Sequence, residues 1–402
     1  MKKRELEQEG KKWVAEGIIT NEQLNKILQR KQQDNPNYII ILFAVLLTGL
    51  GFLTFIMSAW ARQAHFSRVI LIIAVIFFLY ILGDILHRKR NELFGISFIV
   101  LGYIVFGAGF LLVIDIYHVS IYSAWPFLIW GLIGLILYYI YHHPLLFSVA
   151  IFVTTAGQIY NGAAFSEFNW LLLLLFFLGF SYFIYMEKRR LYSYLFAIGY
   201  TIQMLVMLTC VFEQYYWFIV LMLPLYLISS LLRSETERTP IKLVSLVSIF
   251  IFGMYQTFAL QDSWFYKEIQ FEVSFIIVWL ALIISGIVWK LRKNQKEELI
   301  DFILFLPIMF LPLSYLIGII VLFLFSLGWI FIGNYKDNPR SVLLGTVAFL
   351  AITFTVYIQY AWDALDRSLF FFIGGILLFV ISFYIEKQRR KLVNESTGSE
   401  KE

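Results

Sequence analysis

Cysteine is nearly absent from this chain of 402 residues, in which Cys210 is the only one. A single cysteine allows no disulfide within the chain and no metal centre built from several thiolates. Because Cys210 lies inside an apolar stretch, we interpret it as a small side chain that faces lipid or a neighbouring helix.

Charged residues are also scarce, at 15% of the chain, while 60% of the residues are hydrophobic. Soluble domains are typically about 25% charged and about 45–50% apolar. One water-soluble core could not bury so much apolar surface, so lipid must cover it. The composition therefore predicts an integral membrane protein whose first partner is the lipid bilayer.

Recognisable catalytic motifs are missing as well. The chain carries no nucleotide-binding, metalloprotease, kinase or nucleophile-elbow pattern, and no Lys-Ser or Lys-Thr follows Gly107-Ala108-Gly109 as a phosphate loop would require. The sequence therefore predicts no catalytic residue, no cofactor and no metal site, and it favours a protein that is not an enzyme. No cleavable signal peptide is expected, because the first apolar stretch begins near Tyr38, behind a charged segment.

The chain instead contains a long series of apolar segments. A membrane-spanning helix needs about 20 apolar residues, and lipid offers no partner to a bare backbone amide or carbonyl. We therefore predict an all-α polytopic bundle of about fourteen transmembrane helices. The predicted spans are Tyr38–Ala59, Val69–Leu86, Leu93–Ile114, Tyr122–Tyr141, Leu145–Tyr160, Trp170–Met186, Tyr192–Phe212, Trp217–Leu232, Ile241–Leu260, Val273–Trp289, Leu299–Leu311, Leu313–Ile332, Ser341–Gln359 and Leu369–Ile385.

Lys and Arg fix the predicted orientation. With fourteen spans, only Arg62, Arg68, Lys267 and Arg367 of the 32 Lys and Arg fall on one side, and the other 28 share the side of both termini. Cytoplasmic loops collect Lys and Arg, so both termini are predicted to be cytoplasmic, in the cell membrane. The same rule explains the net charge of +5 without nucleic acid, which we do not expect as a partner.

The stretch from Leu299 to Ile332 is ambiguous, because it is long for one span and short for two. Pro307 and Pro312 interrupt it. A single span would reverse everything downstream and put basic residues on the wrong side, so two spans are preferred.

Three regions are expected. Residues 1–36 form a cytoplasmic amphipathic helical hairpin, in which Gly17 ends the first helix and Thr20 with Gln23 forms a capping box at the start of the second. Residues 37–386 form the transmembrane domain, and residues 387–402 form a cytoplasmic polar tail.

Polar residues on the predicted outer face are the candidates for a functional site. Asp115 and His118 lie where the third span leaves the membrane, as a possible proton relay or head-group site. Asp363, Asp366 and Arg367 form the most charged outer loop. The alternative for both groups is a solvated interface loop, with aromatic anchors beside Asp115.

Small and amide side chains are interpreted as packing elements. Gly102, Gly107 and Gly109 would let helix backbones approach closely, and amides in or near the spans would bond across helices. No span carries a charge at its middle, which argues against an ion-coupled pump; Asp301, in the first turn of its span, is the nearest exception. The amides are Gln158, Asn161, Gln203, Gln256 and Gln359.

Several stretches resemble a family of predicted bacterial membrane proteins, domain-of-unknown-function family 2157. They are Trp13 with Gly17-Ile18-Ile19-Thr20 and Glu22-Gln23, Leu101-Gly102 through Gly107-Ala108-Gly109 to Ile116-Tyr117-His118 with Trp130, and Asp366-Arg367 through Gly374-Gly375 to Glu386 and Arg389-Arg390. Family members often have Gln at the position of Asp115. The resemblance implies the multi-span architecture and no particular activity.

Three functions remain open. The first is a non-enzymatic scaffold, sensor or partner of another membrane protein or of itself, in envelope physiology. The second is a transporter or flippase for an amphipathic or lipid-like substrate, and the third is a lipid-modifying membrane enzyme. A continuous polar cavity that reaches the membrane midplane would favour transport, whereas a core filled with apolar side chains would not.

Overall fold

The structure is a computed structural model that describes residues 65–89, 92–232, 234–261 and 269–364. It also describes isolated residues, which are Trp13, Thr20, Gln23, Ala44, Leu47, Thr48, Gly51, Thr54, Phe372, Gly375, Ile376, Phe379 and Phe383. The described residues form helices and turns and no strand, which confirms the all-α prediction for them. The spans predicted at Tyr38–Ala59 and Leu369–Ile385, most of residues 1–36 and the tail 387–402 lie outside the described part.

The chain divides into two compact units. Unit 1 comprises residues Met1–Ile121 and Trp125–Ala150, and unit 2 comprises Tyr122–Ala124 and Ile151–Glu402. The predicted capping box is present in unit 1. Thr20 N donates to Gln23 Oε1 over 2.9 Å, and Gln23 N donates to Thr20 Oγ1 over 3.3 Å.

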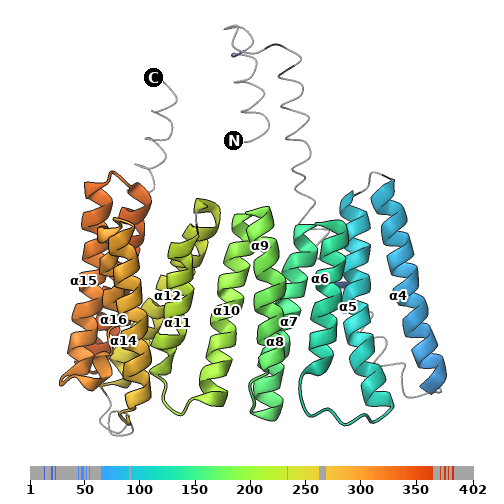
Figure 1. The fold of residues 1–402 in the computed structure, drawn as a ribbon, viewed down its shortest axis with the longest axis horizontal. Coiled ribbons are helices and arrows are strands. Elements are labelled where there is room, and N and C mark those ends of the chain that lie inside the picture. The colour runs from blue at the N-terminus through green and yellow to red at the C-terminus, as the bar shows by residue number, and fades with distance from the viewer. Residues whose placement is uncertain are drawn as a thin grey trace. The chain divides into compact units, whose positions relative to one another are not determined.

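Unit 1 contains helices α4 (His65–Arg88), α5 (Glu92–Ile116) and α6 (Trp125–Tyr141), with the first residues of α7 (Pro144–Phe165). Helices α4 and α5 are antiparallel neighbours (Figure 1). Leu79 of α4 packs with Leu101 and Val105 of α5. Close approach depends on glycine, because a Cβ at Gly83 would lie 2.7 Å from Ile99 Cγ1.

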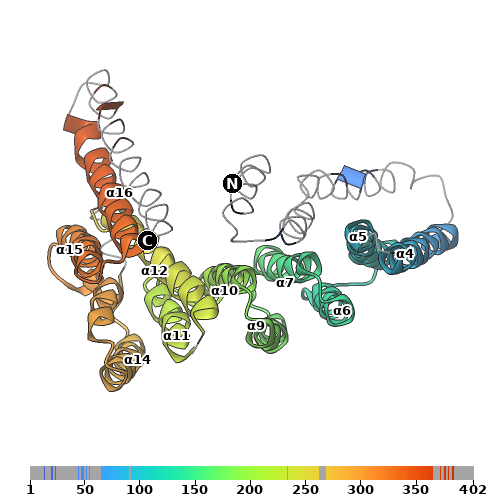
Figure 2. The same ribbon diagram turned by 90° about the horizontal axis from the view of Figure 1, so that it is seen from above.

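Unit 2 contains most of α7 and all later helices. Helices α8 (Trp170–Leu175) and α9 (Ser181–Glu187) are joined by one π-helical turn, η2 (Phe176–Phe180). After them come α10 (Arg190–Val211), α11 (Trp217–Leu231), α12 (Glu235–Ala259), α14 (Val273–Arg292), the 3₁₀ helices η3 (Lys296–Phe305) and η4 (Ile308–Phe310), α15 (Ser314–Tyr335) and α16 (Pro339–Ala364). Seen along the helix axes, α11 lies beside α12, and α15 lies beside α16 (Figure 2).

Nine helices of the described residues are long and apolar enough to cross a membrane, with α8, η2 and α9 taken as one. Two shorter apolar helices, α6 and α11, accompany them. Each of these eleven helices coincides with a predicted span, so a membrane protein with many apolar helices is confirmed. The total of fourteen spans and the orientation of the termini stay predictions.

The predicted α-helical span Leu299–Leu311 is different in the structure. It is the 3₁₀ helix η3, a break at Leu306-Pro307, and the short 3₁₀ helix η4. A 3₁₀ helix rises about 2.0 Å per residue and an α-helix about 1.5 Å. Thirteen apolar residues are too few to cross a bilayer as α-helix, and the longer rise and the proline break extend their reach.

The segment from η3 to η4 runs back along α14. Near the end of α14, Glu298 pairs with Lys290. Farther back, Trp279 Nε1 donates to Phe305 O over 2.7 Å. Near the start of α14, the Phe275 and Phe310 rings lie 6.0 Å apart. Helix α15 then turns back again, so the chain makes two passes between residues 296 and 335.

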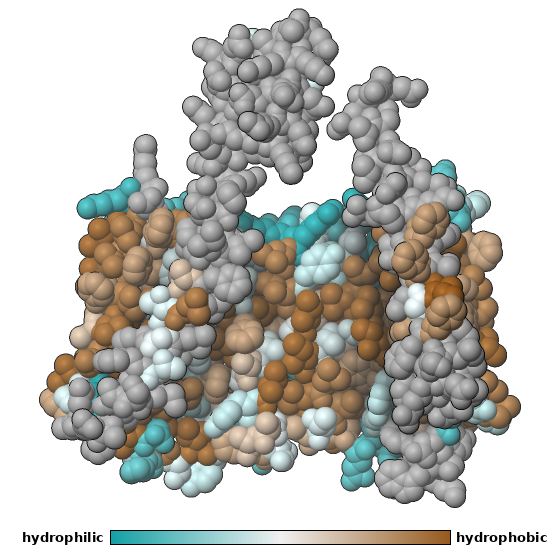
Figure 3. Space-filling view, turned by 180° about the vertical axis from the view of Figure 1, so that it is seen from behind, coloured by the Kyte–Doolittle hydropathy of each residue, from teal (hydrophilic) through white to brown (hydrophobic). Residues whose placement is uncertain are grey.

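Apolar side chains remain exposed along the helices. Phe77, Leu178 and Phe331 are 63%, 68% and 70% exposed. In Figure 3, hydrophobic side chains cover the middle of the helices, and hydrophilic ones gather near the helix ends. Lipid is the environment that suits such a band, because water would leave this apolar surface unburied.

Candidate functional site

The predicted outer-face residues do not form a joined site in the structure. Asp115 and His118 are both exposed at the end of α5. The backbone N of His118 donates to Asp115 O over 3.1 Å, and no hydrogen bond joins the two side chains. The Asp363 side chain, Asp366 and Arg367 lie outside the described residues. A functional role for these residues stays a prediction.

The three predicted packing glycines lie where α5 meets α4 and α6. A Cβ at Gly102 would lie 3.2 Å from Tyr80 Cε1, and one at Gly109 would lie 2.5 Å from Ile72 Cγ2. A Cβ at Gly107 would overlap the indole of Trp130. These positions therefore leave little room for any larger residue.

The amide side chains mostly fix local structure. Asn161 Oδ1 accepts from Ala124 N over 2.7 Å, and Asn161 Nδ2 donates to Glu167 O over 2.6 Å. Gln359 Nε2 on α16 donates to Thr257 O on α12 over 3.0 Å, which is the cross-helix bond expected of such residues. Both amide atoms of Gln203 are buried without a partner.

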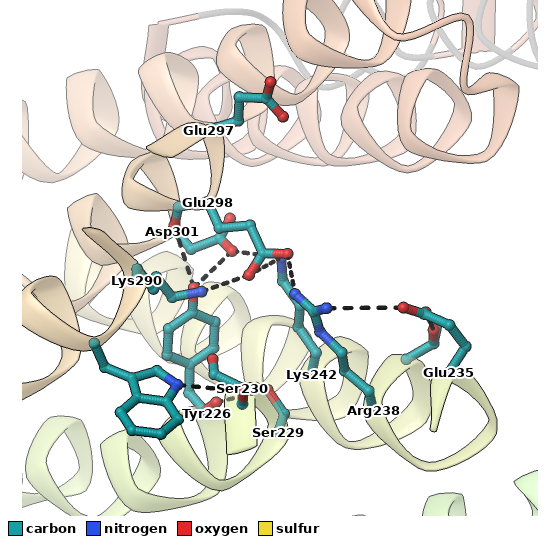
Figure 4. A network of polar contacts seen from close by, with 12 residues as sticks. Tyr226, Ser229, Ser230, Glu235, Arg238, Lys242, Lys290, Glu297, Glu298 and Asp301 are labelled. Carbon is teal, nitrogen blue, oxygen red and sulfur yellow. Dashed lines mark hydrogen bonds and ion pairs between the residues drawn. The ribbon is translucent and has the colours of Figure 1, made fainter. Parts of the chain in front are cut away.

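A cluster of five charged residues forms the most distinctive polar feature of unit 2. Arg238 and Lys242 come from α12, Lys290 comes from the end of α14, and Glu298 and Asp301 come from η3. We call these five residues the charge network. In Figure 4 the two basic side chains of α12 and the Lys290 side chain point toward the two carboxylates.

Local helix geometry places these charges on shared faces. Arg238 and Lys242 are four residues apart, so they lie on one face of α12. Glu298 and Asp301 are three residues apart, and a 3₁₀ helix has three residues per turn, so they lie on one face of η3. An α-helix in place of η3 would rotate the second carboxylate away from the first.

Glu298 is the centre of the charge network. Its Oε1 lies 2.5 Å from Arg238 Nη2, and its Oε2 lies 2.5 Å from Lys290 Nζ and 3.4 Å from Lys242 Nζ. Burial opposes ionisation of this carboxyl group, but the three cations together lower the pKa of Glu298 to about 2. Glu298 is therefore a carboxylate at neutral pH.

The two most buried charges of the network are also compensated. The side chain of Lys290 is 0% exposed and that of Asp301 is 1% exposed. Asp301 accepts hydrogen bonds from Tyr226 Oη and Trp329 Nε1, each over 2.8 Å, and lies 2.8 Å from Lys242 Nζ. The Lys290 ammonium also lies 4.6 Å from the centre of the Tyr226 ring. The network therefore ties α11, α12, α14, η3 and α15 together.

A cavity of about 880 Å³ lies beside the charge network, among α10, α12, η3, α15 and α16. We call it the charged pocket. Its charged lining residues are Arg190, Glu235, Arg238, Lys242, Glu297, Glu298, Asp301, Lys336 and Arg340, and apolar side chains, including Leu243, Ile300, Ile332 and Leu344, complete the wall. The pocket is thus amphipathic as well as charged.

Aromatic rings fill the interior on the other side of the network. The Tyr226 ring lies 5.4 Å from Phe302 and 5.5 Å from Phe305. Toward the opposite ends of the same helices, the Tyr216 ring lies 4.7 Å from Phe275 and 5.3 Å from Phe310. Helices α11 and α14 and the 3₁₀ segment are therefore packed shut between their two ends.

The charge network was not found from sequence, because its members are separated by up to 63 residues and four of them were assigned to loops or loop edges. Asp301 alone was noted, as a charge in the first turn of a span. Two signals were available: the i, i+4 pair Arg238 and Lys242, and the i, i+3 pair Glu298 and Asp301. Opposite charges at such spacings on two apolar-flanked segments indicate faces that could meet.

Metal binding and known relatives add limited constraints. Among the described residues, no group of three or more His, Cys, Asp or Glu side chains could hold a metal ion. Residues 11–147 match the family model DUF2157, described as "Predicted membrane protein". This match confirms the family resemblance for that range, and the likeness of the stretch from Asp366 to Arg390 stays a prediction. No curated protein and no solved structure matches the chain.

Proposed function

We propose that this chain is a non-enzymatic multi-pass protein of the cytoplasmic membrane that acts as a sensor or scaffold, with both termini in the cytoplasm. In this orientation the charged pocket opens at the cytoplasmic ends of the helices, where the basic residues are expected. Another membrane protein or a second copy of the chain would be the partner in the membrane.

The observation that carries this proposal is the closed interior behind the pocket. Glu298 and Asp301 are fully engaged by cations and hydrogen-bond donors, and aromatic rings fill the space from Tyr226 to Tyr216. A pocket with a filled base suits binding at one membrane face. Transport of a polar substrate needs a site that can open to both faces, usually near the midplane.

Reconstitution into liposomes tests the proposal against the transporter or flippase hypothesis. We expect proteoliposomes to move a fluorescent head-group-labelled lipid between leaflets no faster than protein-free liposomes. We expect the same for release of a trapped small anionic dye. Protein-dependent movement of either probe, growing with the amount of protein per vesicle, would contradict the sensor or scaffold proposal.

A further inference from the structure

Positive charge exceeds negative charge around the charged pocket. Among the described residues that line it or belong to the charge network, six are cationic, namely Arg190, Arg238, Lys242, Lys290, Lys336 and Arg340, and four are carboxylates, namely Glu235, Glu297, Glu298 and Asp301. The excess is two positive charges. A site with this balance favours an anion over a cation.

All four carboxylates are already occupied by neighbouring cations. Glu297 pairs with Lys336, and Glu235 pairs with Arg238. Glu298 and Asp301 are held within the charge network. The pocket therefore has no free carboxylate with which to bind a cation.

The two arginines account for the excess charge. Arg190 begins α10, Arg340 lies in the first turn of α16, and both side chains are exposed and line the pocket. Among the described residues, neither guanidinium has a carboxylate within ion-pair distance. A guanidinium presents several N–H donors in a fixed plane, which suits a phosphate group.

The start of α16 does not itself supply the anion site. Asn338 Oδ1 accepts from the backbone N of Arg340 over 3.2 Å and from that of Ser341 over 3.4 Å, so this helix end is already capped. Anion binding must therefore rely on the side chains. The apolar part of the wall, from Leu243, Ile300 and Ile332, gives an adjoining surface that an acyl chain can cover.

We propose that the charged pocket binds a doubly charged phosphate group through Arg190 and Arg340, with the paired cations Arg238 and Lys336 nearby. The phosphate belongs to a lipid head group or to a free phosphate ion, and the apolar wall favours the lipid. This site would provide the signal for the proposed sensor, on which its physiological meaning rests. Lipid binding and transport have different readouts, so the two proposals fail separately.

Native mass spectrometry of the purified full chain in detergent tests the site, with phosphatidic acid as the anionic probe and phosphatidylcholine as the comparison. We expect saturable binding of phosphatidic acid and none of phosphatidylcholine. The double variant R190Q/R340Q should bind phosphatidic acid roughly tenfold more weakly, since each charge-assisted contact contributes on the order of 1 kcal/mol or less at an exposed site. Arg340→Gln alone should lose about threefold, and it is used if the double variant does not fold.

The matched control is R292Q/K293Q, which removes two exposed basic residues at the end of α14 that do not line the pocket. It should bind within about twofold of the wild type. Competition by millimolar inorganic phosphate would assign the site to the free ion, and its failure would assign the site to the lipid; either supports phosphate recognition. Equal binding of the two lipids, or wild-type binding by R190Q/R340Q and R340Q, would overturn the proposal.

Discussion

Replacing Glu298 with Gln lowers the free energy of unfolding by about 3–5 kcal/mol, which is the usual cost of removing one partner from a buried ion pair. The substitution keeps the shape of the side chain but removes the charge that Arg238, Lys242 and Lys290 share. Lys290 has no exposure to water, so its ammonium would then be buried with one carboxylate less. Reversible unfolding in mixed micelles, followed by circular dichroism during titration with SDS, measures the change.

Lys290→Met is the matched variant, because methionine is unbranched and apolar. It removes the buried cation and leaves Glu298 paired with Arg238 and Lys242, so we expect a smaller loss than for E298Q. In the double variant K290M/E298Q the two losses should not add, because the charges belong to one network. Additive losses, or an E298Q protein as stable as the wild type, would show that these groups do not interact as described.

The same network makes stability depend on acid. The pKa of Glu298 is about 2 in the folded protein, below its usual value of 4.5. A lowered pKa stabilises the folded state above pH 4.5, and this contribution is lost as the pH falls toward 2. The wild type should therefore lose stability across this window relative to E298Q.

Gly107→Ala is expected to destabilise unit 1 by about 1–3 kcal/mol, the typical cost of overpacking. The added methyl would overlap the indole of Trp130. That indole cannot easily move, because Trp130 Nε1 donates to Tyr103 O over 3.1 Å and Tyr103 Oη donates to Trp130 O over 2.9 Å. The same SDS titration measures the loss.

Ile136→Ala on α6 is the control for Gly107→Ala, because Ile136 is 49% exposed and its truncation should cost little in lipid or detergent. In a Trp130→Leu background, Gly107→Ala should have almost no further effect, since the overlapping ring is gone. A full additional loss in that background would place the cause in α5 itself rather than at its contact with α6.

The helices were predictable because each apolar segment is long enough to require helical backbone in lipid. Their ends were less predictable. Helix α12 was predicted to begin at Ile241 but begins at Glu235, since its polar first turns face the charged pocket. Hydropathy marks the apolar part of a helix and misses polar turns that another segment covers.

The 3₁₀ segment and the charge network could not be derived from sequence in the same way. Two passes between residues 299 and 332 followed from charge counting, but their geometry depends on how α14 and α15 hold the intervening residues. The network joins Tyr226 to Asp301 and Arg238 to Glu298, contacts that only the packed helices define. The outer-face candidates Asp115 and His118 had a local motif but share no side-chain bond.

Cysteine accessibility tests the central claim most directly, namely that the chain crosses the membrane repeatedly with the charged pocket at the cytoplasmic face. The lone Cys210 is replaced by Ser, and Asn338→Cys, at the pocket, and Tyr122→Cys, between α5 and α6, are made separately at exposed positions. In intact cells a membrane-impermeant maleimide should label Y122C, whereas N338C should be labelled only after permeabilisation. Labelling of N338C from outside, or of both positions from the same side, would contradict the account.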